Sequence, residues 1–443
     1  MMPCTNKGRS PSSANDTTTN DASTSRAFNS QKEIWQLEQQ IVASLVQVPP
    51  DPPVDSTIVD DNPLFHLVKD DHHDVFSFSS VPELYGGVDV SFAPEDNDRA
   101  VAVYVIVDKR TMEVLYHDYE YFHLEVPYIP GYLAFREIQP MEMLIQRQLK
   151  NRPDMTPIAI LVDGNGIFHP RRAGIACFVG TRTNIPTIGI GKTLYYEAGW
   201  TREIVNVMVD TFLEELHSCI MTSSTQNSSL ASRLSRYRGL ILKREWVDPK
   251  IVKIDNNIPI RNGEMMISEE QEDSKPTANP LKSESSAAVS HSEKDRRKNI
   301  LRDLAPYCNG MGVYLKGCSE IDGQQQQSED GNHHHYHHST ASRFPVLACA
   351  LVGHGGQIAA SSKSEPVPGT KNPIYVSVGH KISLQQAVQI SASLSMARIP
   401  EPVRQADLLG RSLLRKRELR CDEEDEDEEA MSSPMPKRAS LGF

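Results

Sequence analysis

The chain has 443 residues, a net charge of −12 and only 7% aromatic residues, which predicts a folded core smaller than the whole chain. Eight acidic residues form one run, residues 422–429, so the remaining charge is nearly balanced and argues neither for nor against nucleic-acid binding. Seven scattered cysteines without a CxxC pair argue for free thiols and against zinc, and no apolar run reaches the roughly 20 residues of a membrane helix. We therefore expect an intracellular protein, cytoplasmic or nuclear, that no membrane anchors.

The N-terminal part is expected to contain one helix. Residues 1–30 are polar and too poor in apolar side chains to fold, so we expect a disordered tail there. In residues 31–48 apolar side chains recur at helical spacing until two prolines end the pattern. These side chains are Ile34, Leu37, Ile41 and Leu45. The spacing predicts an amphipathic helix.

The central part alternates between apolar segments and turn-forming residues. Strands are expected at residues 85–92, 100–107, 112–123, 155–161 and 186–191, of which the first three form an antiparallel meander. Helices are expected at residues 131–150, with a kink or break at Pro140, and at residues 171–183. The order of these elements predicts a mixed α/β sheet flanked by helices.

One predicted strand ends in an acid. Asp163 follows residues 155–161, and Gly164 begins a sharp turn behind it. Pro170 suits the start of the next helix, which leaves His169 at the rim of a cleft. Taken alone, this segment favours a turn or capping role for the aspartate, so its function depends on its neighbours.

The second half of the chain is expected to be less regular. Residues 201–343 form a long insertion, largely low-complexity and disordered, with glutamine and histidine tracts that build no core. Regular structure resumes with strands at residues 344–352 and 373–378 and a helix at residues 383–397. The folded domain therefore comprises residues 31–200 and 344–412, followed by a charged, disordered tail at residues 413–443.

Five ionisable side chains occupy apolar settings, one within the first strand, one on a helix and three at the ends of strands. They are Asp89, Glu137, Asp163, Lys192 and His380. Hard cations such as Mg²⁺ bind carboxylates, water and substrate phosphate, a lysine can neutralise charge on a phosphate, and a histidine can relay a proton. Each residue alone is a weak signal, because buried structural histidines and solvated lysines are common. Together they favour phosphodiester hydrolysis.

Five segments in collinear order carry a resemblance to a known family. GVDVSF, PYIPGYLAFRE, DGNGIFHPRRAGIA, PTIGIGK and NPIYVSVGHKISL resemble the signature blocks of the endonuclease V family. The resemblance implies a ribonuclease-H-like fold and Mg²⁺-dependent cleavage of inosine-containing nucleic acid, with Mn²⁺ able to substitute. Cleavage is implied 3′ of the inosine, usually at the second phosphodiester, leaving 5′-phosphate and 3′-hydroxyl ends.

The resemblance also implies roles for individual residues. Asp89 and Asp163 are implied to bind the metal, with Glu137 completing the cluster directly or through water, while Lys192 contacts the phosphate and His380 assists the attacking water. The loop Pro127, Tyr128, Ile129 and Pro130 is implied to be a wedge between bases. The base pocket is implied to be formed by Gly131, Leu133, Gly164, His169, Gly174 and Ile175.

Three functional interpretations remain open from the sequence. The favoured one is an active, monomeric, inosine-directed endonuclease, with single-stranded RNA preferred over DNA. A second is another ribonuclease-H-like nuclease, for which the wedge loop would have no role. A third is a non-catalytic inosine-binding module, although all five catalytic positions are occupied by reactive side chains.

Overall fold

The structure is a computed structural model of the whole chain. The residues it describes are 17–51, 65–68, 82–93, 98–124, 126–194, 199–226, 240–244, 296–297, 299–304, 307–308, 310–316, 346–353 and 372–432. The glutamine and histidine tracts, most of the predicted N-terminal tail and the last 11 residues lie outside them. None of the described helices is both long enough and apolar enough to cross a membrane.

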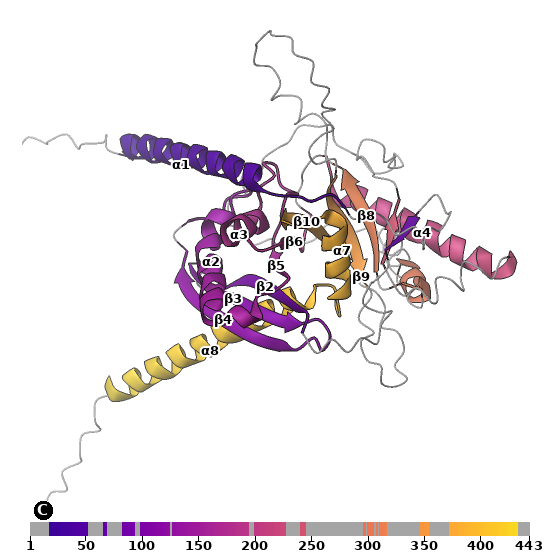
Figure 1. Cartoon of the computed structure of the whole chain (residues 1–443). Coiled ribbons are helices and arrows are strands. Elements are labelled where there is room, and N and C mark those ends of the chain that lie inside the picture. Colours follow the sequence, from indigo (N-terminus) through magenta and orange to yellow (C-terminus); the bar gives the residue numbers. More distant parts are fainter. Residues whose placement is uncertain are drawn as a thin grey trace, which may run out of the picture.

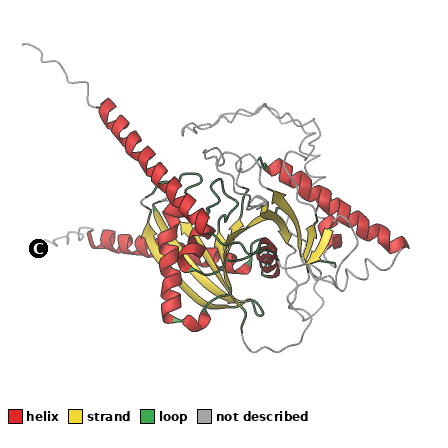
Figure 2. Cartoon of the chain, turned by 45° about the horizontal axis from the view of Figure 1, so that its top comes forward, coloured by secondary structure: helices red, strands yellow, loops and turns green. Residues whose placement is uncertain are grey.

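A ten-stranded mixed sheet forms the centre of the molecule (Figure 1), in the order β1-β7-β8-β9-β10-β6-β5-β2-β3-β4. The strands are β1 (Phe65–Val68), β2 (Leu84–Phe92), β3 (Arg99–Asp108), β4 (Val114–His123), β5 (Ala159–Asp163), β6 (Thr187–Gly191), β7 (Leu240–Lys243), β8 (Gly310–Lys316), β9 (Val346–Gly353) and β10 (Ile374–His380). The main helices are α1 (Thr17–Leu45), α2 (Ala134–Asn151), α3 (Ile175–Thr183), α4 (Arg202–Gln226), α7 (Leu384–Ser393) and α8 (Glu401–Ser432). The long helices α1 and α8 extend away from the side that carries α4 (Figure 1, Figure 2).

The topology confirms the predicted fold class. Strands β2, β3 and β4 form an antiparallel meander, and β5 and β6 join β2 in parallel. Nearly every residue of β3 is buried because α2 and α8 both pack against it. Its continuous run of valine, alanine and isoleucine is typical of a strand covered on both faces. A meander continued by parallel strands is the arrangement that the ribonuclease-H-like prediction requires.

Several predicted boundaries move in the structure. Helix α2 runs through Pro140 without a break. Helix α3 begins at Ile175 rather than at residue 171, because Gly174 occupies its N-cap after a turn that includes Arg172 at a positive φ of 54°. Helix α8 continues to Ser432, well past the predicted start of the tail. Local patterns located α2 and α3 but not α8, and α1 begins at Thr17, inside the predicted N-terminal tail.

Helix α1 buries a different face from the one that its apolar spacing suggests. The four side chains of the predicted stripe, Ile34, Leu37, Ile41 and Leu45, are each 56–59% exposed. The buried positions are instead Trp35, Gln39, Val42 and Val46. The indole of Trp35 stacks on Phe135 of α2 with ring centroids 5.1 Å apart. Aromatic packing therefore determines which side of the helix faces the core.

The interval 201–343, predicted to be a largely disordered insertion, contributes a second hydrophobic cluster. Helix α4 and strands β7 and β8 bury Phe212, Leu216, Ile241 and Leu315 against β9. The described parts of this interval are therefore folded and supply core, whereas the interval was predicted to be largely disordered. These strands are short apolar segments separated by long polar ones, so sequence periodicity alone does not reveal that they extend the sheet.

Truncation of Leu315 tests this second core. Leu315 is fully buried, so Leu315→Ala should lower the free energy of unfolding by about 2–5 kcal/mol through lost transfer energy and a residual cavity. Denaturant unfolding measures the change. The matched control is Leu115→Ala on β4, where the side chain is 43% exposed and the change should stay within about 0.5 kcal/mol. Equal small effects of both variants would contradict a structural role for β8.

Candidate active site

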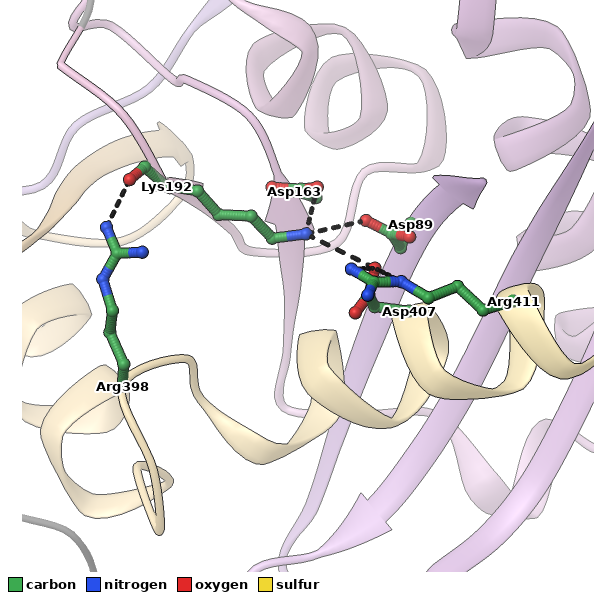
Figure 3. A network of polar contacts seen from close by, with 6 residues as sticks. All are labelled: Asp89, Asp163, Lys192, Arg398, Asp407 and Arg411. Atoms are coloured by element: carbon green, nitrogen blue, oxygen red, sulfur yellow. Dashed lines mark hydrogen bonds and ion pairs between the residues drawn. The ribbon is translucent and has the colours of Figure 1, made fainter. Parts of the chain in front are cut away.

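The register of the central strands brings two aspartates together. Val88 of β2 lies beside Val162 of the parallel strand β5, so Asp89 and Asp163 follow side by side. Lys192 comes directly after β6, the next parallel strand. Its ammonium nitrogen lies 2.7 Å from Asp163 Oδ2 and 3.4 Å from Asp89 Oδ1 (Figure 3). The structure therefore brings three of the five predicted catalytic residues into direct contact.

A fourth charged group, absent from the sequence prediction, joins this cluster. Asp407 Oδ1 on α8 lies 3.8 Å from the Lys192 ammonium and accepts hydrogen bonds from Arg411 at 2.9 and 3.1 Å (Figure 3). The feature that could have identified Asp407 as a site residue is its position on α8. It lies four residues after the buried Val403, and therefore on the helix face that packs against the sheet. An acid on a core-facing stripe requires a partner, and here the partner is the lysine.

Two acids of the site, Asp89 and Glu137, hold their protons more tightly than ordinary carboxyls. Burial, reinforced by a hydrogen bond and repulsion from Asp163, raises the pKa of Asp89 well above its usual value. Burial and then repulsion from Asp163 raise the pKa of Glu137 to about 8, against the opposing effect of Arg136. The Glu137 side chain is 5% exposed, so it is not a solvated surface charge. Acids that are costly to ionise together favour a bound cation.

The donor set fits a hard divalent cation in its chemistry. Two carboxylates converge on the position now held by an ammonium, and oxygen is the ligand that Mg²⁺ prefers. Among the described residues no three His, Cys, Asp or Glu side chains already form a complete ligand set. Protein carboxylates typically supply only one or two Mg²⁺ ligands, with water and substrate phosphate supplying the rest. Attraction to Asp163 and Asp89 outweighs the burial of Lys192 and raises the pKa of its ammonium.

A cavity of about 610 Å³ opens beside this cluster. Glu137, Asp163 and Lys192 line one part of it. The predicted base-pocket and wedge residues that line it are Tyr128, Pro130, Gly131, Leu133, Gly164, His169, Gly174 and Ile175. Pro127 and Ile129 lie in the same loop but are not part of the lining. The side chain of Tyr128 is 67% exposed, so its ring is free to contact a ligand at the mouth.

Three side chains converge on one carbonyl oxygen in the cavity wall. The Gly131 oxygen accepts from Gln39 at 2.9 Å and from Arg171 at 2.8 Å, and it lies 3.1 Å from His169 Nε2. The Arg171 main-chain N–H donates to His169 Nδ1 at 3.2 Å, so Nδ1 is an acceptor and Nε2 carries the proton. Burial first, and then the charge of Arg171, lowers the pKa of His169 to about 3 and keeps its ring neutral. These contacts fix the wall at Gly131.

His169 and Gln39 modify the sequence prediction. His169 lines the cavity as expected, but its side chain is 5% exposed and lies inside the core rather than at a rim. Gln39 of α1 is 1% exposed and also lines the cavity, although no sequence pattern indicated a functional role. The feature that could have drawn attention to Gln39 is its place among the buried positions of the helix, because a buried amide needs hydrogen-bond partners.

Two glycines shape the wall through their lack of a side chain. Gly164 has a φ of 129°, and a Cβ there would lie 2.6 Å from Cγ2 of Ile175. A Cβ on Gly174 would lie 2.1 Å from the Asn165 carbonyl oxygen. Only glycine fits both positions without moving the backbone. At these two positions the cavity wall is therefore main chain.

His380 is not part of the cluster, so the catalytic role predicted for it is wrong. Strand β10 runs antiparallel to β6, and His380 pairs with Thr187, whereas Lys192 follows the opposite end of β6. The five residue steps from Thr187 to Lys192 place His380 roughly 17 Å from Lys192 along the strand. The Gln47 N–H donates to its Nδ1 at 3.3 Å, and burial lowers the pKa of the ring. His380 is a buried structural histidine.

Comparison with known proteins gives the family. The family model described as Endonuclease V matches residues 69–231 and 333–408. Human endonuclease V is 25% identical over 331 residues, which cover 75% of this chain and 71% of that protein. Mouse endonuclease V is 43% identical over 118 residues, or 27% of this chain and 35% of the mouse protein. The region that the family model matches includes the segments that carry Asp89, Glu137 and Asp163.

Solved structures of endonuclease V are also similar to this chain. The catalytic domain of human endonuclease V has a TM-score of 0.46 and 23% identity, covering 87% of this chain and 97% of the other. Endonuclease V of Ciona intestinalis, solved with a DNA that contains an inosine followed by a ribo-adenosine, has a TM-score of 0.45 and 21% identity, covering 87% of this chain and 99% of the other. The family match over more than half of the sequence shows that this chain belongs to the endonuclease V family.

Proposed function

We propose that this chain is a Mg²⁺-dependent endonuclease that recognises inosine in nucleic acid and hydrolyses a phosphodiester 3′ of it, usually the second. Family membership supports the class of reaction. The observation that carries the proposal is the position of the acid cluster beside a cavity of about 610 Å³ whose wall includes Gly164 and Gly174. A base fits such a cavity while the adjoining phosphate reaches the acids.

Asp89 and Asp163 would hold the metal, with Glu137 contributing directly or through water. When bound, Mg²⁺ lowers the pKa of a water molecule and stabilises charge on the leaving oxygen. Asp89 lies within β2 and Asp163 ends the neighbouring strand β5, so the sheet positions their oxygens before substrate arrives. The expected products carry 5′-phosphate and 3′-hydroxyl ends.

Lys192 would act on the phosphate. Its ammonium lies among three carboxylates, and its raised pKa keeps it charged at neutral pH. A bound cation would compete with the lysine for the aspartates and leave the ammonium free to contact a phosphate oxygen. A positive charge held there stabilises the negative charge that develops in the transition state.

Main-chain groups of the cavity wall would recognise the base. Hypoxanthine has an oxygen where adenine has an amino group, so a main-chain N–H aimed at that position accepts one base and rejects the other. Gly164 and Gly174 allow the backbone to approach the base closely. The neutral His169 ring and the hydrogen bonds at Gly131 would keep the wall rigid.

A cleavage assay tests the proposed function. Matched RNA and DNA oligomers that carry one inosine, and identical oligomers with adenosine or guanosine at that position, are incubated with the full chain and Mg²⁺. We expect a single nick one nucleotide beyond the inosine, faster in single-stranded RNA than in DNA. Cutting without regard to inosine would indicate a general nuclease, and retention of the inosine oligomer without cutting would indicate a binding module.

Removal of the Tyr128 ring should weaken recognition of the base. Stacking of an aromatic side chain on a base is worth about 1–3 kcal/mol, so Tyr128→Ala should weaken binding of the inosine oligomer by roughly 5- to 150-fold. Fluorescence anisotropy measures the affinity. The control Tyr119→Ala removes a ring that is 40% exposed on β4 and does not line the cavity, and its affinity should match wild type. Equal affinity of both variants would contradict the proposed role of the Tyr128 loop in contacting the base.

Mg²⁺ binding should strengthen as the pH rises towards 8. Glu137 has a pKa of about 8, so below that pH it carries a proton that the metal has to displace. For one displaced proton the dissociation constant should fall by up to about tenfold per pH unit between pH 6 and 8 and then level off. Calorimetric titration measures it. The variant Glu137→Gln should flatten this dependence, whereas an unchanged slope would exclude Glu137 from the site.

A further inference from the structure

Arg398 contacts the main chain that carries the catalytic lysine. It lies in the segment between α7 and α8, and its guanidinium reaches the carbonyl oxygen of Lys192 (Figure 3). The same Nη2 donates to the Pro373 oxygen at 3.1 Å, and Nε donates to the Asn372 oxygen at 3.2 Å. One side chain therefore connects the residue after β6 with the two residues before β10.

These contacts lie where the regular pairing of the sheet ends. The ladder between β6 and β10 stops at the pair Gly191 and Tyr375. The Lys192 carbonyl lies one residue beyond it, and the guanidinium supplies its hydrogen bond. Arginine suits this place because its planar fork can reach three carbonyl oxygens at once, which a lysine ammonium on a flexible stem does not do.

The same segment of chain also holds the other end of Lys192. Asp407 lies nine residues after Arg398 and 3.8 Å from the Lys192 ammonium, and Arg411 fixes Asp407 in turn. Lys192 is thus held at its main chain by Arg398 and near its tip by α8 (Figure 3). Arg398 itself does not line the cavity.

We propose that Arg398 is a positioning residue that fixes the Lys192 backbone, so that the ammonium stays beside Asp89 and Asp163 during turnover. The inference rests on the role proposed above for Lys192. The effect is indirect, since Arg398 touches neither the cavity nor the acids. A displacement of a catalytic group by about 1 Å costs up to roughly 100-fold in rate, so loss of this anchor should appear mainly in kcat.

A double-mutant cycle distinguishes positioning from a general structural role. Arg398→Ala should lower kcat by roughly 10- to 100-fold and change KM by less than about twofold. In the Lys192→Ala background the same substitution should lower kcat by less than about twofold, because the group that it positions is already gone. Arg398→Lys should restore only part of the rate, since it keeps the charge but not the fork. Equal losses of kcat in both backgrounds would overturn the proposal.

A matched control and a structural readout complete the test. Arg152→Ala removes another arginine, whose ion pair with Asp154 is exposed and remote from the cavity, and should leave kcat unchanged. In a crystal structure of Arg398→Ala, or of Arg398→Lys if the alanine variant does not fold, the contact between Lys192 Nζ and Asp163 Oδ2 should lengthen beyond 2.7 Å. An unmoved lysine in that structure would also overturn the proposal.

The outcomes separate this inference from the proposed function. If wild type cuts oligomers without inosine preference, the proposed specificity fails. The double-mutant cycle of Arg398 and Lys192 is then measured with whichever substrate is cut. If wild type cuts nothing, the nuclease function fails, and the position of the Lys192 ammonium in the variant structure still decides whether Arg398 anchors it.

Discussion

Asp89→Asn and Asp163→Asn should each abolish cleavage of an inosine oligomer while leaving its binding close to wild type. Each substitution removes a charged metal ligand yet preserves the size of the side chain. Loss of such a ligand should lower kcat by at least about a thousandfold, because the metal supplies the activated water and stabilises the leaving oxygen. Single-turnover cleavage measures the rate, and anisotropy with Ca²⁺ in place of Mg²⁺ measures the affinity.

The control for these variants is Asp154→Asn. Asp154 carries an exposed carboxylate that pairs with Arg152 outside the cavity, and its loss should leave the rate unchanged. A fall in binding as large as the fall in cleavage would contradict the metal role, since the cavity wall and the Tyr128 loop remain in both variants.

Lys192→Ala should produce the second large effect. The ammonium is the cation shared by Asp89, Asp163 and Asp407, and removal of one preorganised charge at a reacting group typically costs about 100- to 1000-fold in kcat. Steady-state kinetics on the inosine oligomer should show this loss with little change in KM. Because the lysine also offsets repulsion between the acids, the variant should bind Mg²⁺ at least as tightly as wild type.

Lys109→Ala provides the comparison for Lys192. Lys109 pairs with Glu83 at 3.5 Å and does not line the cavity. The kcat and the Mg²⁺ affinity of the Lys109→Ala variant should therefore match wild type. If Lys192→Ala retained full kcat, the lysine would be only a partner of the acids in the metal-free protein.

The sequence predicted the catalytic half of the fold because its signals are local. Strands β2 to β6 are apolar segments bounded by turn residues, and parallel neighbours place their carboxyl ends at one edge of the sheet. The meeting of Asp89, Asp163 and Lys192 follows from that rule together with the register between β2 and β5.

The remaining features depend on contacts between distant parts of the chain. Strand β10 runs antiparallel to both β6 and β9, within a sheet that β7 and β8 extend, and local sequence patterns do not reveal that this direction places His380 at the opposite end of β6 from Lys192. Asp407 reaches the cluster only because α8 crosses β2 and β3. Gln39 similarly lines the cavity because Trp35, one turn earlier on the same face of α1, packs against α2.

The most direct test of the account is a crystal structure of the wild-type chain soaked with Mn²⁺. Mn²⁺ replaces Mg²⁺ at oxygen sites and is located by its anomalous scattering. We expect one strong peak about 2.1 Å from a carboxylate oxygen of both Asp89 and Asp163, with the Lys192 ammonium displaced from between them. A peak that contacts neither aspartate, or one bound to only one of them with Lys192 unmoved, would contradict the shared-cation site.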